Sequence, residues 1–152
     1  MKQVYTESIL LIERLHRRFL DVVKAELDRL KIDDVNNVQT LILYNIGEEQ
    51  LTIGELTNRG YYLGSNVSYN VKKLVENGYL EQARAQHDKR STRIKLSEKA
   101  IVLCKKIDAL YQRNIDVLSQ ETNQNELAAL NKTLIQLENF WTNYINNIHK
   151  VK

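Results

Sequence analysis

The stretch that most constrains the fold is residues 51–96, where two helical patterns separated by a glycine-bearing turn are followed by two strand-like runs. In the second helical pattern, residues 65–77, apolar side chains recur at the spacing of one helix face, at Val67, Val71, Leu74 and Val75. The other side chains of this helix are polar, short at its N-terminal end and then cationic. The pattern therefore predicts a helix that buries one stripe and leaves its opposite face free for a partner.

The residues on either side of this helix predict a tight connection at its start and a sharp end. Ser65 can cap the helix, and Gly60 and Gly64 lie in the turn that separates it from a shorter helix over residues 52–59. Gly78 can end the helix in the left-handed conformation that glycine readily adopts. Two helices joined by a short turn that contains glycine form a helix-turn-helix.

Two short strands are predicted after the helix-turn-helix. Residues 79–85 and 91–96 have the composition of strands, and the charged residues 86–90 connect them. Leu51 can add a third short strand. A helix-turn-helix followed by a β-hairpin is a winged helix, so the sequence predicts this fold with a small hairpin wing.

Candidate DNA contacts fall on the outer face of the second helix and on the wing, because short polar side chains suit base edges and cations suit phosphates. The helix candidates are Ser65, Asn66, Ser68, Tyr69, Asn70, Lys72 and Lys73, and the wing candidates are Asp88, Lys89, Arg90 and Arg93. In the wing, Asp88 can orient the guanidinium of Arg90. Taken alone, an ordinary solvated helix face or a charged hairpin tip would carry similar residues. From residue 59 to residue 99, however, nine basic residues stand against four acidic ones in a chain of net charge +3, which favours nucleic-acid binding.

The rest of the chain predicts long helices at both ends. The sequence has no proline, so the usual helix breaker is missing. Amphipathic spacing predicts helices over residues 6–30, 35–46 (capped by Asp34), 98–119 (capped by Ser97) and 127–148. In the last of these, apolar side chains alternate in steps of three and four residues, which is typical of a helix that pairs with another helix.

The apolar faces of the terminal helices predict a homodimer, because a winged helix of about 60 residues already closes its own small core. The predicted fold is mainly α. Residues 1–34 and 97–152 form a helical dimerisation region, and residues 35–96 form the winged helix-turn-helix DNA-binding domain. Two copies would bring two recognition helices to one pseudo-palindromic double-stranded DNA operator.

The string DKRSTRIKLSEKA, residues 88–100, is similar to the wing pattern of the MarR family of bacterial transcription regulators, D-x-R followed by an alternating strand and a helix start. Residues 59–80 and 12–18 look closer still to LdtR-type members of that family. The resemblance implies recognition helices in adjacent major grooves and wings in the flanking minor grooves. It also implies a repressor-like response, in which a small aromatic or phenolic effector relieves operator binding.

The candidate effector pocket lies between the dimerisation helices and the DNA-binding lobe. Its candidate residues are Phe19, Thr40, Tyr44, Tyr61 and Tyr62, although these side chains could equally belong to the core. The family's frequent regulatory cysteine lies near the N-terminus, whereas the one cysteine here, Cys104, follows the wing. Cys104 is therefore expected to be a small buried apolar residue and not a thiol sensor.

Catalysis, metal binding and membrane insertion are not expected. The sequence has no glycine-rich phosphate loop and no nucleophile elbow, and we expect neither an enzyme nor a cofactor. Three histidines are too scattered to suggest a metal site. No apolar run approaches the roughly 20 residues of a membrane span, and a cytoplasmic protein is expected. The alternative function is a protein-interaction module that docks a heterologous partner through its terminal helices, and the basic centre argues against it.

Overall fold

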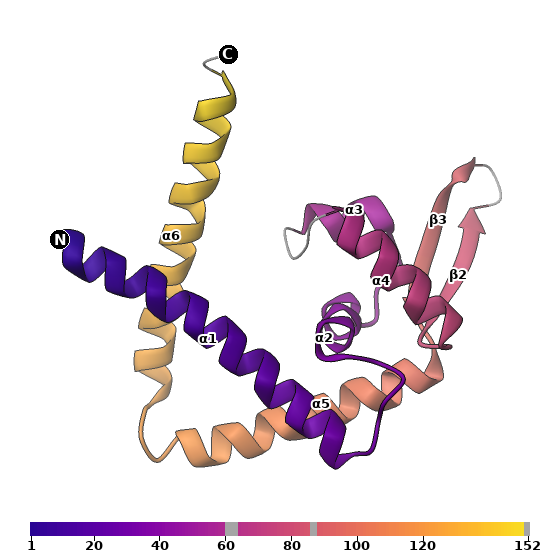
Figure 1. Ribbon diagram of the computed structural model, residues 1–152, viewed down its shortest axis with the longest axis horizontal. Coiled ribbons are helices and arrows are strands. Elements are labelled where there is room, and N and C mark those ends of the chain that lie inside the picture. The colour runs from indigo at the N-terminus through magenta and orange to yellow at the C-terminus, as the bar shows by residue number, and fades with distance from the viewer. Residues whose placement is uncertain (60–63, 86–87, 151–152) are drawn as a thin grey trace. The chain divides into compact units, whose positions relative to one another are not determined.

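The computed structural model describes residues 1–59, 64–85 and 88–150, with backbone alone at residues 64–65, 84–85 and 88–91. In chain order the elements are α1 (Lys2–Arg29), α2 (Asn37–Ile46), β1 (Leu51–Thr52), α3 (Ile53–Asn58), α4 (Gly64–Glu76), β2 (Leu80–Ala85), β3 (Asp88–Leu96), α5 (Glu98–Leu118) and α6 (Gln124–Lys150) (Figure 1). They fall into two compact units, residues 1–110 and residues 111–152. The predicted fold class, a mainly helical winged helix-turn-helix, is confirmed.

The start of α2 differs from the sequence prediction. Asn36, not Asp34, caps the helix: its Oδ1 accepts from the backbone N–H of Gln39 at 2.8 Å, and Gln39 Oε1 accepts from the backbone N–H of Asn36 at 3.1 Å. This is a capping box, which satisfies two orphan donors reciprocally. The prediction for Asp34 was wrong because its carboxylate is hydrogen-bonded to side chains of two other elements.

The helix-turn-helix is formed by α3 and α4. Thr52 caps α3 and forms a second capping box with Glu55. Helix α4 begins at Gly64, so Ser65 lies inside its first turn and does not occupy the predicted cap position. At its other end Gly78 has φ +79°. The N–H of Tyr79 donates to the carbonyl of Leu74 at 2.9 Å and that of Gly78 to Val75 at 3.1 Å, the paired bonds of a Schellman motif.

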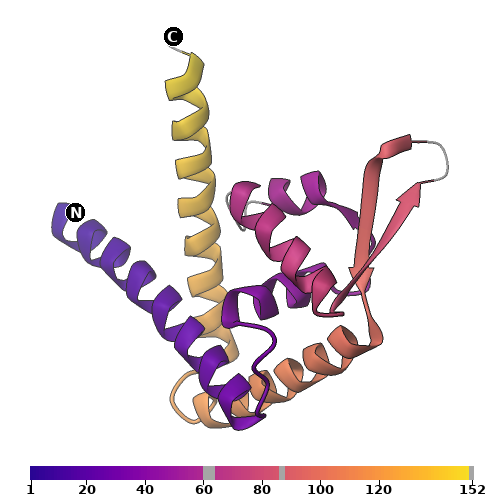
Figure 2. The same cartoon turned by 45° about the vertical axis from the view of Figure 1, so that its right-hand side comes forward.

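The sheet has three antiparallel strands in the order β1-β3-β2. Leu51 pairs with Ile94, which confirms the predicted third strand, and Leu80 pairs with Leu96. Strand β3 begins at Asp88, three residues earlier than predicted, so the wing connection is shorter than expected. In two views the β2–β3 hairpin projects beyond α3 and α4, and α4 packs against β2 (Figures 1 and 2).

Within the described residues of the unit 1–110, a hydrophobic core holds α1 to α4, the sheet and the start of α5 together. Its buried side chains come from the C-terminal part of α1, from α2, α3 and α4, from the sheet and from the start of α5. From α4 they are Val67, Val71 and Leu74, which confirms three positions of the predicted stripe, and the fourth, Val75, is partly buried and packs against the core. Since this stripe faces the core, the opposite face of α4 is left at the surface.

The two last helices begin at side-chain caps. Ser97 Oγ accepts from the backbone N–H of Ala100 at 3.3 Å, which confirms the predicted cap of α5, and donates to the carbonyl of Gly78 at 2.7 Å. Asn123 Oδ1 accepts from the backbone N–H of Glu126 at 3.1 Å at the start of α6. Helix α6 buries no residue within the described chain. No helix in the described ranges is long and apolar enough to cross a membrane.

Candidate nucleic-acid interface

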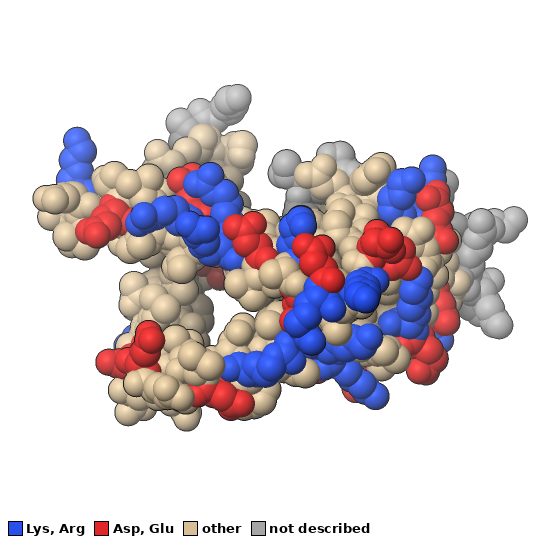
Figure 3. All heavy atoms as spheres, turned by 60° about the horizontal axis from the view of Figure 1, so that its bottom comes forward, with Lys and Arg blue, Asp and Glu red and all other residues tan. Residues whose placement is uncertain are grey.

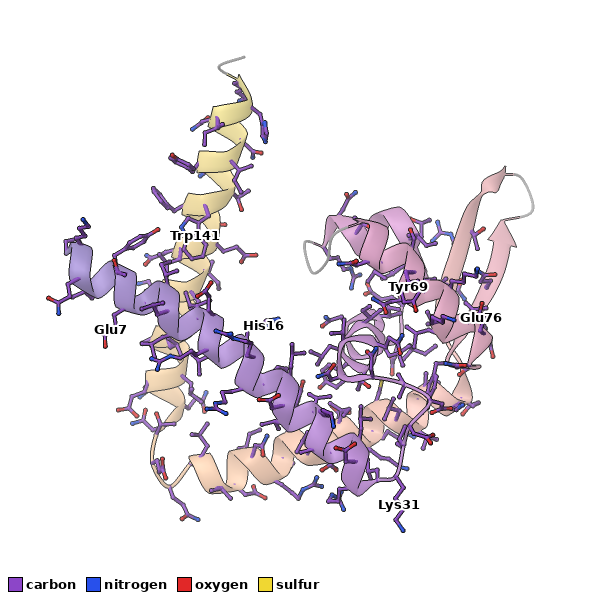
Figure 4. All side chains as sticks on the ribbon, viewed as in Figure 1. Glu7, His16, Lys31, Tyr69, Glu76 and Trp141 are labelled. Atoms are coloured by element: carbon purple, nitrogen blue, oxygen red, sulfur yellow. The ribbon has the colours of Figure 1, made fainter. Side chains whose placement is uncertain are left out.

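The outer face of α4 carries polar and aromatic side chains at the surface. Asn66, Ser68 and Lys72 are exposed, and Tyr69 is 61% exposed although it is large and partly apolar. Figure 4 shows Tyr69 on α4 and Glu76 at the C-terminal end of the same helix. Because this face points away from the core, these four side chains can reach base edges or phosphates if α4 lies in a groove of nucleic acid.

Two further candidates on α4 already have partners in the protein. Lys73 Nζ lies 3.4 Å from Glu76 Oε2 and 5.9 Å from the centroid of the Tyr69 ring. Asn70 is half-buried, and its Oδ1 accepts from Gln39 Nε2 at 3.2 Å. The sequence predicted one polar face on α4. In the structure, some of its side chains are exposed and others are bonded to neighbouring residues of the protein.

The wing candidates are described unequally. Arg93 is exposed on β3, and its neighbour Lys95 lies 3.5 Å from Glu81 across the hairpin. The side chains of Asp88, Lys89 and Arg90 lie outside the described residues, as does that of Ser65. The prediction that Asp88 orients Arg90 stays a prediction.

A polar cluster that the sequence did not predict holds the C-terminal end of α4. We call it the Asp34 cluster: Asp34, Asn77, Tyr79 and Lys99. Asp34 accepts from the Tyr79 hydroxyl at 2.5 Å and from Lys99 Nζ at 2.5 Å. Lys99 Nζ also donates to the carbonyl of Asn77 at 2.9 Å, and Asn77 Nδ2 donates to the carbonyl of Asp34 at 2.9 Å. The cluster joins the segment between α1 and α2 to the end of α4 and the start of α5.

The electrostatics of the Asp34 cluster follow from these contacts. Partial burial raises the pKa of the Asp34 carboxyl, but the hydrogen bonds from Lys99 and Tyr79 and the lysine charge outweigh it, so the pKa is lowered. Burial and the neighbouring carboxylate raise the pKa of the Tyr79 hydroxyl well above its ordinary value. Lys99 Nζ also lies 4.3 Å from the centroid of the Tyr79 ring. The charged carboxylate and the neutral phenol are thus the forms that the fold favours.

Figure 3 shows the charged side chains on one face of the molecule. On this face, lysine and arginine side chains lie beside aspartate and glutamate side chains over most of the view. Such a face matches the ordinary solvated surface of a helical protein. It gives no support for a second DNA-binding face on that side.

The three effector candidates among the described residues, Phe19, Thr40 and Tyr44, lie in different environments. Thr40 is buried and its Oγ1 donates to the carbonyl of Asn36 at 2.8 Å, while Phe19 is 36% exposed on α1. Tyr61 and Tyr62 lie outside the described residues. Tyr44 alone among the described candidates lines a cavity of about 810 Å³ between the end of α2, the sheet and α5.

We call this hollow the α2–α5 cavity. Its lining residues are Tyr44, Gly47, Glu48, Glu49, Gln50, Glu81, Lys95, Leu96, Glu98, Ile101, Cys104, Lys105 and Asp108. The Tyr44 hydroxyl donates to Asp108 Oδ1 at 2.6 Å. Apolar surface from Leu96, Ile101 and Cys104 is thus combined with a rim that carries more carboxylates than lysines.

Cys104 has the properties of a structural thiol. It is half-buried and packs against the core. Burial and the nearby Asp108 raise the pKa of the thiol to about 11. Since the thiolate is the reactive form, this shift lowers the reactivity of Cys104 at neutral pH. Within the described chain, no group of three or more histidine, cysteine or acidic residues could hold a metal ion.

Comparison with known proteins places these features in a family. Residues 35–100 match the model of a winged helix DNA-binding domain. The chain is 39% identical over 142 residues to the exopolysaccharide II synthesis transcriptional activator ExpG of Rhizobium meliloti (strain 1021), covering 91% of this chain and 72% of that protein.

Two solved structures share the fold. A MarR family transcription regulator superposes with a TM-score of 0.77 at 19% identity, over 95% of this chain and 94% of that one. FabT of Streptococcus pneumoniae, solved in complex with DNA, superposes with a TM-score of 0.74 at 16% identity, over 91% of this chain and 98% of that one. ExpG and the MarR family structure are transcription regulators and not enzymes, and together with the DNA complex of FabT they favour the DNA-binding interpretation over a protein-docking module.

Proposed function

The chain belongs to the MarR family of DNA-binding winged helix-turn-helix transcription regulators, and we propose that two copies of it bind one pseudo-palindromic operator and release it when a small aromatic or phenolic ligand binds. The observation that carries the proposal is the exposed polar face of α4, set on a core that buries the opposite stripe. In a helix-turn-helix the second helix enters the major groove, and α4 holds that position in the motif.

Within α4 we assign different tasks to different side chains. Asn66, Ser68 and Tyr69 are exposed and would contact base edges, while the exposed Lys72 would contact phosphate. Lys73 is paired with Glu76, so its contribution to phosphate binding should be smaller than that of Lys72. Ser65, in the first turn, remains a candidate base contact.

The wing supplies the second contact. Asp88, Lys89, Arg90 and Arg93 are proposed to lie beside the minor groove, whose negative potential attracts guanidinium groups where it is narrow. If Asp88 orients Arg90, Asp88→Ala should weaken operator binding even though it removes a negative charge. A tighter complex of this variant would reduce the wing to a generic basic patch.

The dimer is proposed from the apolar surface that the terminal helices expose. On α6 the large exposed side chains are Leu127, Leu130, Leu134, Ile135, Phe140, Tyr144, Ile145 and Ile148, and on α1 they are Val4, Tyr5, Leu10, Leu11, Leu15, Phe19 and Val22. Surface of this extent is uncommon on a monomeric protein and marks an interaction site. Residues 1–34 and 97–152 are accordingly proposed as the dimerisation region, with residues 35–96 as the DNA-binding domain.

The α2–α5 cavity is our candidate effector site. It borders both proposed regions, and Tyr44 offers it an aromatic ring. Because carboxylates outnumber lysines in its lining, a neutral phenol should bind there more readily than an aromatic acid, which carries a negative charge at pH 7.

The experiment that tests the DNA-binding proposal starts from an operator selected out of a randomised duplex library. Tyr69→Ala and Asn66→Ala should lower discrimination between the operator and its mutants by about 1 to 3 kcal/mol where the residue makes a good base contact. Lys72→Ala should weaken binding to all duplexes alike and flatten the salt dependence. Lys106→Ala, which removes the same charge from an exposed position on α5, is the matched control and should change neither. Unchanged binding by all the α4 variants would exclude α4 as the reading helix.

A further inference from the structure

The side chain of Asn70 occupies an unusual position for a candidate reading residue. It lies at the edge of the exposed face of α4, half-buried, and its Oδ1 accepts from Gln39 Nε2 at 3.2 Å. Gln39 is 7% exposed and belongs to α2, far from Asn70 in the sequence. The hydrogen bond therefore ties a surface residue of α4 to a buried residue of another helix.

The orientation of both amides is determined by a chain of hydrogen bonds that starts at the backbone. The backbone N–H of Asn36 can only donate, so the atom of Gln39 that it meets at 3.1 Å must be the carbonyl oxygen Oε1. That leaves Nε2 as the end of Gln39 that faces Asn70. Since Nε2 can only donate, Asn70 must present Oδ1 to it, and the amide nitrogen Nδ2 is directed away from α2. Among the described residues Asn70 Nδ2 donates no hydrogen bond.

We propose that Gln39 is a specificity-positioning residue: through its amide it fixes Asn70 with the donor group Nδ2 toward the DNA. This inference rests on the proposed reading role of α4. A donor in the major groove recognises acceptors, which are O6 and N7 of guanine, N7 of adenine and O4 of thymine, whereas an acceptor recognises N4 of cytosine and N6 of adenine. The capping box of α2 thus determines which class of base edge Asn70 can read, although Gln39 itself touches no DNA.

The substitution that tests this assignment is Gln39→Glu. Glutamate is an ordinary partner in a capping box and is favoured near a helix N-terminus, so the bond to the Asn36 N–H can persist. Its second carboxylate oxygen accepts and cannot donate. Asn70 must then turn its amide over, donating Nδ2 to residue 39 and presenting Oδ1 outward. The preferred base at the contacted position should change from one that presents an acceptor to one that presents a donor.

Asn70→Asp tests the same logic without altering α2. Its carboxylate can accept from Gln39 Nε2 and present only an acceptor outward, so it should produce the same change of base preference, on the order of tenfold. Gln39→Met, which removes both amide groups, should flatten the preference without reversing it. The readout is the relative affinity for operators that differ at one base pair, because added negative charge weakens all duplexes together.

A measurement without DNA separates this inference from the DNA-binding proposal. By NMR, the Nδ2 protons of Asn70 should exchange rapidly with water in the parent protein and be protected in Gln39→Glu, while the Nε2 protons of Gln39 are protected in the parent. If Asn70→Ala leaves the base preference of the parent unchanged, Asn70 does not read DNA and the inference falls with that role. If Asn70→Ala flattens the preference but Gln39→Glu and Asn70→Asp keep the parental base, the reading role stands and the positioning role of Gln39 is refuted.

Discussion

Replacing Asp34 by alanine should lower the free energy of unfolding by about 2 to 3 kcal/mol, because it removes two charge-assisted hydrogen bonds at once. Tyr79 is 3% exposed, so its hydrogen bond to the Asp34 carboxylate is buried. Such a bond to a charged group stabilises the folded state by about 1.5 kcal/mol, at the lower end of the usual range. The pair with Lys99 is about half exposed on both sides and adds roughly 0.2 to 1 kcal/mol. The rest of the cost of Asp34→Ala comes from the buried Tyr79 hydroxyl, which is left without a hydrogen-bond partner.

A double-mutant cycle isolates the bond between Asp34 and Tyr79. Tyr79→Phe alone should cost about 1 to 1.5 kcal/mol. In the Asp34→Ala background it should cost nothing or stabilise the protein slightly, since the bond is already lost and the substitution removes the stranded hydroxyl. Urea unfolding at a fixed protein concentration measures all four proteins, because the stability of a dimer depends on concentration. Additive effects within about 0.5 kcal/mol would show that the two side chains do not stabilise each other.

The pH dependence of this contribution has a definite sign. The pKa of Asp34 is lowered in the fold, so the contribution of Asp34 to the free energy of unfolding is complete at neutral pH. It begins to be lost as the pH falls below about 4, the ordinary pKa of an aspartate, and is gone below the lowered pKa of the folded protein. The pKa of the Tyr79 hydroxyl is raised, so its contribution is lost only as the pH rises above about 10. The difference in the free energy of unfolding between the parent and Tyr79→Phe should therefore be constant from about pH 5 to pH 9 and become smaller below and above this range.

Three further predictions concern other parts of the chain. Leu134→Glu should convert the proposed dimer to monomers or aggregates in sedimentation, while Lys132→Glu, also on α6, should not; an intact Leu134→Glu dimer would remove this part of α6 from the proposed interface. Ile101→Trp should fill the α2–α5 cavity and abolish the release of DNA by phenols, whereas Val102→Trp, outside that cavity, should leave the response unchanged. The Cys104 thiol, with its pKa near 11 instead of 9.0, should be alkylated roughly 100-fold more slowly at pH 8 in the folded protein than in urea, and equal rates would contradict its buried character.

The parts of the fold that the sequence predicted are those that depend on local pattern. The buried stripe of α4 follows from helical spacing alone, and the end at Gly78 follows from the one residue type that accepts φ +79° without strain. In each case the physical cause lies within one or two turns of chain.

The errors arose where distant residues compete for a polar group. Asp34 and Asn36 are both good helix caps, and sequence alone does not choose between them. The choice is settled by Tyr79 and Lys99, which lie far along the chain and hold the Asp34 carboxylate. Asn70 was predicted to be exposed and is half-buried, because it is hydrogen-bonded to Gln39 on another helix, which the local sequence pattern does not reveal.

These long-range hydrogen bonds share one partner segment, and they determine the orientation of α4. The C-terminal end of α4 is held through Asn77 and the adjoining Tyr79, both bonded to Asp34, and the middle of α4 is held through Asn70, bonded to Gln39. Both anchors thus lie in residues 34–39, the short segment that follows α1 and begins α2. A helix attached at two points two turns apart has a fixed axis and a fixed rotation about that axis. Because α1 belongs to the proposed dimerisation region, we expect a displacement of its C-terminal end to reach α4 through these two anchors, without requiring a ligand to touch α4 itself.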